Sequence, residues 1–435
     1  MSVLSFLGGI HPSDKKELSK DKAIEIAPVP KKVIVPLVQH IGAPAQAIVS
    51  VGQEVKTGEL IANAGGFVSA SVHAPISGII TALTETRHPI GRMVPAIVIE
   101  GNGEDTRASA ETCEDYSALS ADVLKSKVMA AGLVGMGGAT FPTHVKLSPP
   151  KEKNIDTLII NGVECEPYLT SDYRLMLERP EDILAGTRIL MKILGINSAT
   201  IGIENNKPDA IAAMKKAIGS DSSLSVAGLK VKYPQGAEKM LIKAVAGREV
   251  PPRALPMDVG VVVQNVGTAI AVYEAISCGK PLIERVVTIT GEGIRQPKNI
   301  MARIGTPLSD LLDMCGGISA EPVKIICGGP MMGFAQTTTD IVMNKGMSGI
   351  VVLPAKCTEA SGDFGPCIRC GRCIKVCPMR LMPSQLGVLA EKGFYEDAKK
   401  YGLHDCFECG SCTYVCPSKR PIVQFVKLAK SLTKP

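Results

Sequence analysis

The sequence predicts a multidomain protein in which two small β-rich units flank a central α/β layer and a cysteine-rich domain follows. Three observations predict this class. Glycine and proline turns recur every few residues over 31–100 and 284–353, helix and strand patterns alternate over 115–283, and eight cysteines form two regular runs after residue 366. With 435 residues, 45% of them hydrophobic and 21% charged, the chain can bury several cores.

Composition excludes several functions. Tryptophan is absent and aromatic residues make up 4%, which argues against stacking platforms for single-stranded nucleic acid. Met1–Ile10 has no basic start and no small-residue cleavage site, so we expect no secretory leader. Val259–Gly279 is the most apolar stretch, but Gln264 and Asn265 interrupt it, so we expect no transmembrane segment. The 14 cysteines then suggest metal ligation in a reducing compartment rather than disulfides.

The chain opens with a polar, lysine-rich segment, and we expect residues 1–30 to form an N-terminal arm. Residues 31–100 carry the pattern V-G-x-x-V-x-x-G-x-x-I from Val51 and A-P-x-S-G from Ala74. This pattern resembles the barrel-sandwich of biotinyl and lipoyl domains. The hairpin Phe67–Val72 lacks the lysine that such domains modify, so the resemblance implies an unlipoylated structural module.

The central segment, 115–283, alternates helices with short apolar strands, which predicts an α/β layer with a largely parallel sheet. Proline at a first helical position supports two of the predicted helices. We expect helices over Ser120–Ala131, Pro180–Leu194, Pro208–Ile218, Ala237–Ala246 and Thr268–Ser277, and strands over Ile155–Ile160, Ala199–Glu204, Leu229–Tyr233 and Val259–Gln264.

The second β-rich unit spans 284–353. Its predicted strands are Arg285–Gly291, Pro322–Pro330 and Gly349–Leu353, and one helix over Pro307–Cys315 lies among them. Strands packed on a single helix indicate a β-grasp unit.

The last predicted domain, 360–435, holds two runs with the spacing C-x2-C-x2-C-x3-C-P, typical of a bacterial two-cluster ferredoxin. Three thiolates of a cubane cluster come from one tight loop, and the following turn carries the fourth cysteine of that run away. The spacing therefore predicts crossed ligation of two [4Fe–4S] clusters, by a cluster-1 set, Cys367, Cys370, Cys373 and Cys416, and a cluster-2 set, Cys406, Cys409, Cys412 and Cys377. Cysteine pairs also bind zinc, but two matched runs that each end in Cys-Pro favour clusters.

Two helices, Pro383–Gly393 and Pro421–Ser431, should link and close this domain. Residues 366–435 hold 12 Lys and Arg against 5 Asp and Glu. This excess indicates either a docking face for an acidic partner or membrane, or local compensation of negatively charged clusters, and we favour compensation.

Four loops of the α/β layer carry polar and glycine-rich patterns. Gly135–Lys146 is a glycine-rich turn between two helices, which suits a phosphate or ring but also occurs as a plain connector. Since a helix precedes it, it is not a dinucleotide fingerprint. Asn161–Pro167, Tyr233–Glu238 and Asn265–Thr268 each follow a predicted strand. Ligands bind at the carboxyl ends of such strands, so we expect the four loops to converge.

These loops read G-x-G-G-A-x-F-P-T-x-x-K, N-x-x-E-x-E-P, Y-x-x-G-x-E and N-V-x-T, and together resemble the flavin- and NADH-binding subunit of respiratory complex I. The whole order of units, with a β-grasp of the SLBB type, resembles the C subunit of the Rnf complex. That complex is an ion-translocating ferredoxin:NAD+ oxidoreductase of bacterial membranes. The resemblance covers nearly all of the chain, from Gly9 to the last Cys-Pro.

The resemblance implies non-covalent FMN and NAD(H). It places FMN against Gly135, Gly137, Gly138, Lys146, Asn161, Glu164, Tyr233, Gly236, Asn265 and Thr268. It places the nicotinamide nucleotide against Phe141, Lys146, Glu166 and Glu238. Val163 and Ala237 stand where the complex I pattern has Asp and Glu, so flavin contacts through these two positions are in doubt. No residue is expected to act as an acid or base.

Electron chemistry also favours a flavin between the nucleotide and the clusters. NAD(P)H gives two electrons and a cluster takes one, and a flavin converts between the two. The resemblance implies a peripheral subunit on the cytoplasmic side of the membrane. Its partners would be a ferredoxin-accepting iron–sulfur subunit and integral membrane subunits, with no nucleic acid. Two alternatives stay open: a soluble flavin and iron–sulfur cobalamin (corrin) reductase, and a non-catalytic iron–sulfur relay.

Overall fold

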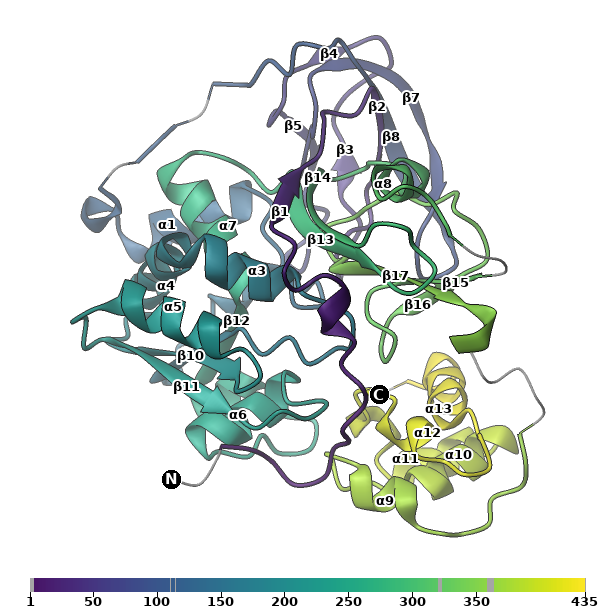
Figure 1. Ribbon diagram of the computed structural model, residues 1–435. Coiled ribbons are helices and arrows are strands. Elements are labelled where there is room, and N and C mark those ends of the chain that lie inside the picture. Colours follow the sequence, from purple (N-terminus) through teal and green to yellow (C-terminus); the bar gives the residue numbers. More distant parts are fainter. Residues whose placement is uncertain (1–3, 110, 114, 320–322, 358–363, 435) are drawn as a thin grey trace.

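The computed structural model describes residues 4–109, 111–113, 115–319, 323–357 and 364–434. The starts of the predicted arm, of the predicted strand at Pro322 and of the predicted last domain lie outside this range. Four units pack together, with the barrel-sandwich and the cysteine-rich domain at opposite ends (Figure 1). The fold class is the expected one, α/β combined with small β units.

The first β-rich unit is made of two antiparallel sheets, with strand orders β2-β8-β7-β4 and β3-β5-β6. One apolar core lies between them and takes residues such as Val35, Ile61 and Ile97 from both sheets. The strands are β2 (Lys32–Pro36), β3 (Gln46–Ala47), β4 (Glu54–Val55), β5 (Leu60–Asn63), β6 (Val72–His73), β7 (Gly78–Arg87) and β8 (Met93–Gly101).

The α/β layer holds a fully parallel sheet in the order β11-β10-β9-β12. Its strands are β9 (Thr157–Asn161), β10 (Ala199–Glu204), β11 (Leu224–Leu229) and β12 (Val261–Asn265). Its helices are α1 (Ala121–Ala130), α2 (Thr143–Lys146), α3 (Ser171–Glu178), α4 (Pro180–Leu194), α5 (Pro208–Ile218), α6 (Glu238–Ala246) and α7 (Val266–Ser277), with short 3₁₀ turns at Tyr116–Ala118 and Pro256–Val259. A parallel sheet places the ends of β9 and β12, and hence the loops after them, at one edge.

One strand prediction in this layer is wrong. The strand expected over Leu229–Tyr233 lies instead at Leu224–Leu229, where it pairs in register with β10. The segment that was predicted as a strand makes a different contact. Tyr233 and Ile10 exchange backbone hydrogen bonds of 2.8 and 2.9 Å. The apolar pattern after residue 229 therefore reflects contact with the N-terminal segment rather than sheet pairing.

The second β-rich unit is a six-stranded mixed sheet in the order β1-β14-β13-β17-β15-β16. Helix α8 (Leu308–Met314) contributes Leu308, Leu311 and Leu312 to its core. The strands are β1 (Ile24–Ile26), β13 (Glu284–Thr290), β14 (Lys298–Arg303), β15 (Val323–Cys327), β16 (Phe334–Gln336) and β17 (Gly349–Pro354), and a 3₁₀ turn at Ala355–Cys357 follows. Strand β1 comes from the N-terminal segment and extends the sheet in parallel with β14.

The cysteine-rich domain is helical. Its elements are α9 (Arg372–Val376), α10 (Pro383–Glu391), α11 (Tyr395–Lys400), a 3₁₀ turn (Leu403–Asp405), α12 (Ser411–Tyr414) and α13 (Ile422–Ser431). Leu386, Leu403 and Val426 form a small core that joins α10 and α13. The two cysteine runs lie around α9 and α12, in the loops and first turns that a cluster domain requires.

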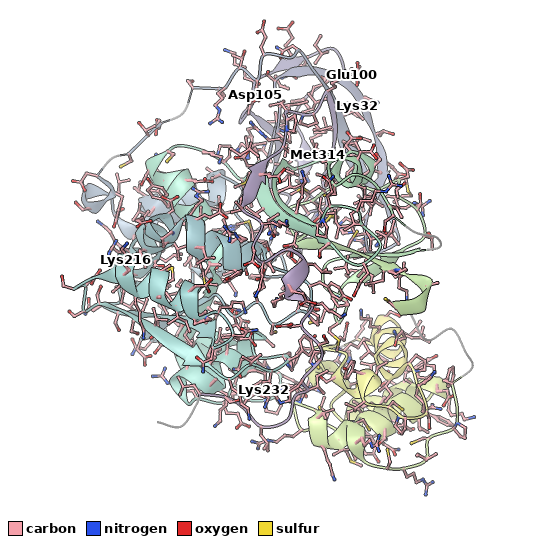
Figure 2. All side chains as sticks on the ribbon, in the orientation of Figure 1. Lys32, Glu100, Asp105, Lys216, Lys232 and Met314 are labelled. Atoms are coloured by element: carbon pink, nitrogen blue, oxygen red, sulfur yellow. The ribbon has the colours of Figure 1, made fainter. Side chains whose placement is uncertain are left out.

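The N-terminal segment runs between the other units (Figure 1). Gly9 donates its backbone N–H to Val376 of the cysteine-rich domain at 2.9 Å, and Lys232 Nζ of the α/β layer donates to the Phe6 carbonyl at 2.9 Å. Figure 2 shows Lys232 at that end of the layer. Lys16, in a 3₁₀ turn at Lys16–Leu18, is buried and donates to the Glu166 carbonyl at 3.0 Å. The segment thus holds three units together.

Among the helices of the described residues, none combines the length and the apolar character that crossing a membrane requires.

Candidate functional site

The glycine-rich turn meets the loop after β12. The Met136 backbone N–H donates to Thr268 Oγ1 at 3.0 Å. A Cβ on Gly137 would lie 3.3 Å from Cβ of Asn265, tighter than ordinary side-chain contacts. Gly138 follows with φ +121°, a backbone conformation that favours glycine. The turn is therefore held close to the sheet edge, while Gly137 and Gly138 stay exposed.

The loop after β9 contacts the loop that leads into α6. Asn161 Nδ2 donates to the Gly236 carbonyl at 2.9 Å, and Asn161 Oδ1 accepts from the Val163 N–H at 3.1 Å. The Gly236 N–H points to Cys165 Sγ at 3.3 Å. Burial raises the pKa of the Cys165 thiol, which makes it a packing residue rather than a reactive one.

Lys146, at the end of α2, connects the turn to α6 and to the sheet. Its ammonium lies 2.6 Å from Glu238 Oε1 and donates to the Val263 carbonyl at 2.9 Å. Glu238 begins α6, where a carboxylate is favourable beside the helix N-terminus. With side-chain exposures of 26% and 36%, this pair stays accessible to a charged ligand at the same edge.

Asn265 organises the end of β12. Its Oδ1 caps α7 by accepting from the Gly267 and Thr268 N–H groups at 2.8 and 3.4 Å. Its Nδ2 donates to Asp172 Oδ2 at 2.6 Å. Burial, and then the neighbouring Glu164 carboxylate, raises the pKa of Asp172 to about 7. Neither Asp172 nor helix α3 was predicted from the sequence, although Thr170-Ser171-Asp172 is a typical helix start.

Three other predicted site residues have protein partners of their own. Glu164 accepts from the N–H groups of Asp172 and Tyr173 at the start of α3. Glu166 accepts from Met331 and Met332 of the β-grasp unit at 3.0 and 2.9 Å, and burial raises its pKa to about 7. Tyr233, which is buried, donates its hydroxyl to the Cys409 carbonyl at 2.7 Å.

The remaining predicted residues lie in the turn itself. The Gly135 N–H donates to the Phe141 carbonyl at 2.9 Å, which closes the turn, and Phe141 is half-buried. The structure thus brings together Gly135, Gly137, Lys146, Asn161, Gly236, Glu238, Asn265 and Thr268. Their glycine backbone, one cation and one carboxylate suit a ligand with a planar ring and an anionic group.

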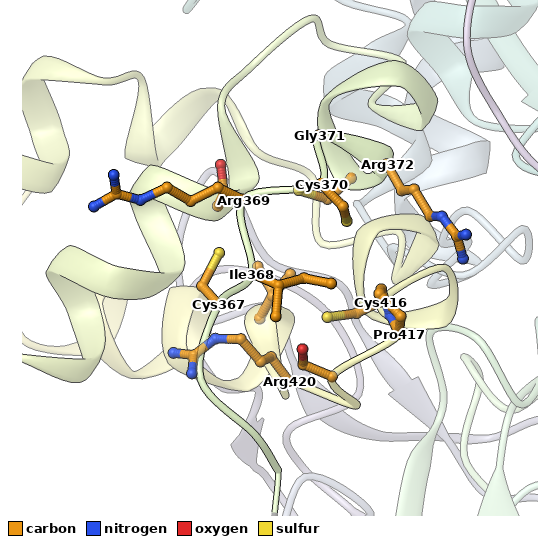
Figure 3. Close-up of a pocket in the computed structure, with 13 residues that line it drawn as sticks. Cys367, Ile368, Arg369, Cys370, Gly371, Arg372, Cys416, Pro417 and Arg420 are labelled. Atoms are coloured by element: carbon orange, nitrogen blue, oxygen red, sulfur yellow. The ribbon is translucent and has the colours of Figure 1, made fainter.

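A pocket in the cysteine-rich domain is lined by Cys367, Cys370, Cys373 and Cys416. Figure 3 shows the sulfur atoms of Cys367, Cys370 and Cys416 around one space. Cys416 belongs to the second cysteine run and still lines the pocket of the first. Four thiols around one space are the donor set that a [4Fe–4S] cluster requires.

The other four cysteines, Cys377, Cys406, Cys409 and Cys412, lie close enough to influence one another. Burial, and then the neighbouring Cys406, Cys409 and Cys377 thiolates, raises the pKa of Cys412. Cys377 therefore lies with the second run. Cys409 packs with Ile10 and Tyr233 at the junction of the domains. Burial likewise raises the pKa of the Cys406 and Cys409 thiols, and a bound metal cluster would offset that cost.

Among the described residues, no three His, Cys, Asp or Glu side chains are arranged to bind one metal ion. A zinc ion needs its ligands within about 2.3 Å of one centre. In a cubane cluster each thiolate binds a different iron, so the four sulfur atoms stand farther apart.

A parallel α/β layer with a glycine-rich ligand edge, joined to a domain with two sets of four cysteines, defines a flavin and iron–sulfur electron-transfer protein. Four family models match: "RnfC Barrel sandwich hybrid domain" over residues 4–104, "Nuo51 FMN-binding domain" over 128–274, "SLBB domain" over 286–335 and "4Fe-4S dicluster domain" over 366–419. The matches follow the order of the units along the chain.

Two similar proteins cover almost the whole chain. The C subunit of the "Proton-translocating ferredoxin:NAD(+) oxidoreductase complex" of Clostridium ljungdahlii is 54% identical over 98% of this chain and 93% of its own length. The C subunit of the "Na(+)-translocating ferredoxin:NAD(+) oxidoreductase complex" of Acetobacterium woodii is 46% identical over 98% of this chain and 96% of its own. The chain therefore belongs to the family of C subunits of ion-translocating ferredoxin:NAD(+) oxidoreductase complexes, as the predicted Rnf resemblance implied.

A solved structure shares the fold. A chain of the NAD+-reducing [NiFe]-hydrogenase in the H2-reduced state aligns with a TM-score of 0.51 at 19% identity, over 74% of this chain and 64% of that chain. At this identity the likeness concerns the fold alone.

Proposed function

We propose that this chain transfers electrons between NAD(H) and a one-electron carrier by means of FMN and two [4Fe–4S] clusters. It does so as the peripheral nucleotide-binding subunit of a membrane-bound ion-translocating complex. The observation that carries the proposal is one contact: Tyr233, in a loop of the flavin edge, donates its hydroxyl to Cys409 of the second cysteine run at 2.7 Å. The loop that we propose beside the flavin thus contacts the loop that carries the proposed cluster-2 set.

The flavin edge is assigned to the residues that converge there. The backbone of Gly135, Gly137 and Gly138 would lie against FMN, and Asn161, Gly236, Asn265 and Thr268 would complete its site. When bound, FMN accepts a hydride and returns electrons singly. Since Glu164 and Tyr233 already have protein partners, the proposal gives them a supporting role, as residues that fix the surrounding loops.

Lys146 and Glu238 are assigned to the nucleotide. Lys146 exchanges its contact with Glu238 for a phosphate oxygen, and Glu238 is then free to accept hydrogen bonds from ribose hydroxyls or the carboxamide. Phe141, half-buried in the glycine-rich turn, would offer an apolar ring surface. Glu166 lies against Met331 and Met332, so we assign it to the contact with the β-grasp unit rather than to the nucleotide.

The two cysteine sets are assigned as cluster ligands, with the crossed pattern that the spacing predicts. The lining of one pocket by Cys367, Cys370, Cys373 and Cys416 supports the cluster-1 set. The mutual influence of Cys377, Cys406, Cys409 and Cys412 supports the cluster-2 set. The Tyr233 contact with Cys409 supports the cluster-2 set as the one nearer the flavin edge.

The test uses purified, iron-reconstituted full-length protein and its Glu238→Gln variant. We expect bound FMN and four-iron clusters in both, and NADH should bleach flavin and cluster absorbance in the parent. The variant should bind NADH about tenfold more weakly, equivalent to about 1.4 kcal/mol. Its stability should change by less than about 1 kcal/mol, because the Lys146 pair is partly exposed. Parent protein that binds no flavin, or a variant with unchanged NADH affinity, would contradict the assignment.

A further inference from the structure

The two cysteine runs differ in how far they are covered. Cys370 and Cys409 are the second cysteines of their runs, and Cys370 is exposed whereas Cys409 is buried. Ile368 of the first run is 64% exposed, but Phe407, at the same place in the second run, packs into an apolar cluster. Because the two runs have the same spacing, this difference comes from what lies over the second run.

Part of this cover comes from residues 4–10, the N-terminal strap, which passes between the α/β layer and the cysteine-rich domain (Figure 1). Ile10 of the strap is buried and belongs to one apolar cluster with Tyr233 and Cys409. Three side chains of the cysteine-rich domain pack against this cluster, namely Val376, Phe407 and Val415. A strap side chain therefore lies where the flavin edge meets the cluster-2 set.

Backbone hydrogen bonds fix the strap on both sides. The Ile10 N–H donates to the Tyr233 carbonyl at 2.8 Å, and the Tyr233 N–H donates back to the Ile10 carbonyl at 2.9 Å. The Gly9 N–H donates to the carbonyl of Val376, the residue before Cys377, at 2.9 Å. The strap thus connects the loop of the flavin edge to the loop of a proposed cluster ligand.

Two glycines allow this close approach. Gly8 has φ +86°, and an added Cβ would lie 3.1 Å from the carbonyl oxygens of both Val376 and Cys377. Gly9 has φ +79°, and an added Cβ would lie 2.7 Å from the Tyr233 carbonyl oxygen. A side chain at either position would meet both an unfavourable backbone conformation and neighbouring backbone atoms. The glycine pair therefore suits a strap that lies directly on these two loops.

We propose that the N-terminal strap excludes water from the cluster-2 set and so keeps the reduction potential of the cluster bound there more negative than that of an uncovered one. Reduction adds one negative charge to a cluster, and water stabilises that charge better than an apolar shell does. Ile10 is a positioning residue, because it acts through Tyr233 and Cys409. The proposal rests on the function proposed above and deepens it at the cluster-2 set.

The test uses full-length, iron-reconstituted protein and its Ile10→Ala variant, which removes most of the apolar cover that the strap supplies. The matched control is Leu7→Ala in the same strap, because the Leu7 side chain is 70% exposed. The reduction potential of each cluster is measured by chemical titration followed by electron paramagnetic resonance. The Cys416→Ser variant, which should impair the cluster-1 set, assigns the remaining signal to the cluster-2 set.

We expect Ile10→Ala to raise the ratio of reduced to oxidised cluster at the cluster-2 set about threefold at a fixed potential, equivalent to about 30 mV for one electron. The cluster-1 potential should stay at the parent value, and Leu7→Ala should change neither potential. Amide hydrogen exchange at Tyr233, which does not depend on the clusters, should become faster in Ile10→Ala alone. If Ile10→Ala lowers iron content, Ile10→Val provides the same comparison.

A second pair of variants tests the strap through its backbone. Gly8→Ala should push the strap away from Val376 and Cys377 and shift the cluster-2 potential in the same direction. Its control is Gly91→Ala in the barrel-sandwich, where φ is +88° but an added Cβ would meet no atom of the described residues within 4 Å. The control has the same backbone strain without the contact, so both potentials should stay at the parent values.

Three results would overturn the proposal: an unchanged cluster-2 potential in iron-loaded Ile10→Ala and Gly8→Ala, an equal shift in the two controls, or an equal shift of both clusters. Failure of the underlying function is distinguishable, because it shows in the parent as absent flavin, absent clusters or absent reduction by NADH. The potentials are read with a chemical reductant, and therefore separately from NADH.

Discussion

At the scale of single residues, the flavin edge depends on short contacts that only small side chains permit. Gly137 approaches Asn265 so closely that a Cβ would lie 3.3 Å from Cβ of that residue. Asn265 cannot retreat easily, because it caps α7 and donates to Asp172. The turn and the cap therefore fix each other, and the exposed backbone beside them is left for a ligand.

We expect Gly137→Val to lower the FMN content per folded chain by about tenfold, equivalent to about 1.4 kcal/mol of lost binding. The added side chain would displace the turn from Asn265 and fill space against the ligand, while the clusters lie in another domain. The measurement is the flavin and iron content per folded chain in the same sample, and flavin should fall while iron stays at the parent level.

The control for this change is Gly66→Val, at an exposed glycine of the barrel-sandwich whose added Cβ would meet only ordinary contact at 3.6 Å. It should leave flavin content at the parent level. Full flavin occupancy in folded Gly137→Val would disprove the site, and flavin loss in both variants would mean that the turn is merely a connector.

At the scale of elements, the positions of the cysteine runs support the proposed crossed ligation. Helix α9 begins inside the first run, and Cys377, at its end, lies away from Cys367 and beside Cys406 and Cys409. Cys416 reaches the first pocket in the same way after α12. One short helix per run thus places its fourth cysteine near the other set.

Cys377→Ser should impair the cluster of Cys406, Cys409 and Cys412, and Cys416→Ser should impair the other, each variant losing up to about half of the iron. Electron paramagnetic resonance of the two variants distinguishes the clusters, because each should retain the signal that its counterpart loses. Loss of the cluster formed by the neighbours within the same run would contradict crossed ligation.

A second prediction at this scale concerns the contact between the α/β layer and the cysteine-rich domain. Tyr233→Phe leaves the Cys409 carbonyl without its buried donor, at a cost of about 1–3 kcal/mol. We expect faster amide hydrogen exchange around α12, with iron and flavin contents unchanged. Tyr414→Phe, at an exposed tyrosine, should not alter exchange; equal rates in both variants would show that the contact contributes nothing.

At the scale of the whole molecule, buried basic side chains join the units. Lys345 of the β-grasp unit is fully enclosed and donates to carbonyls of Ser71 in the barrel-sandwich and Gly132 in the α/β layer, at 2.8 and 2.7 Å. Arg285 donates to the Lys345 carbonyl at 2.6 Å. Burial lowers the pKa of Lys345 to about 7, and burial together with Lys345 lowers the pKa of nearby His73 to about 3.

This burial makes stability depend on pH. The folded pKa of Lys345 lies below the unfolded value of about 10.4, so between these values the unfolded chain binds more protons. The free energy of unfolding should therefore rise from about pH 7 toward pH 10, with a slope of up to about 1.4 kcal/mol per pH unit. Urea midpoints at several pH values measure this, and Lys345→Met should flatten the rise. Lys32→Met, at an exposed lysine, should preserve it; an unaltered slope in Lys345→Met would contradict the assignment.

The sequence by itself determined the order of the units, most helices and strands of the α/β layer, and the two cysteine sets as predicted ligands. These features are local: helix caps, apolar periodicity and fixed spacings act within one segment, so they can be read along the chain. The sequence misplaced the strand at Leu224–Leu229 and missed helix α3. In both places, the local pattern depends on contacts with residues distant in the chain.

Only the tertiary structure decided which partners the site residues take. It assigned Glu166 to Met331 and Met332, joined Tyr233 to Cys409, and extended the β-grasp sheet with strand β1 of the N-terminal segment. Each of these pairs joins residues more than 150 positions apart. Such contacts follow from how whole units pack around their cores, and no pattern within a single segment encodes them.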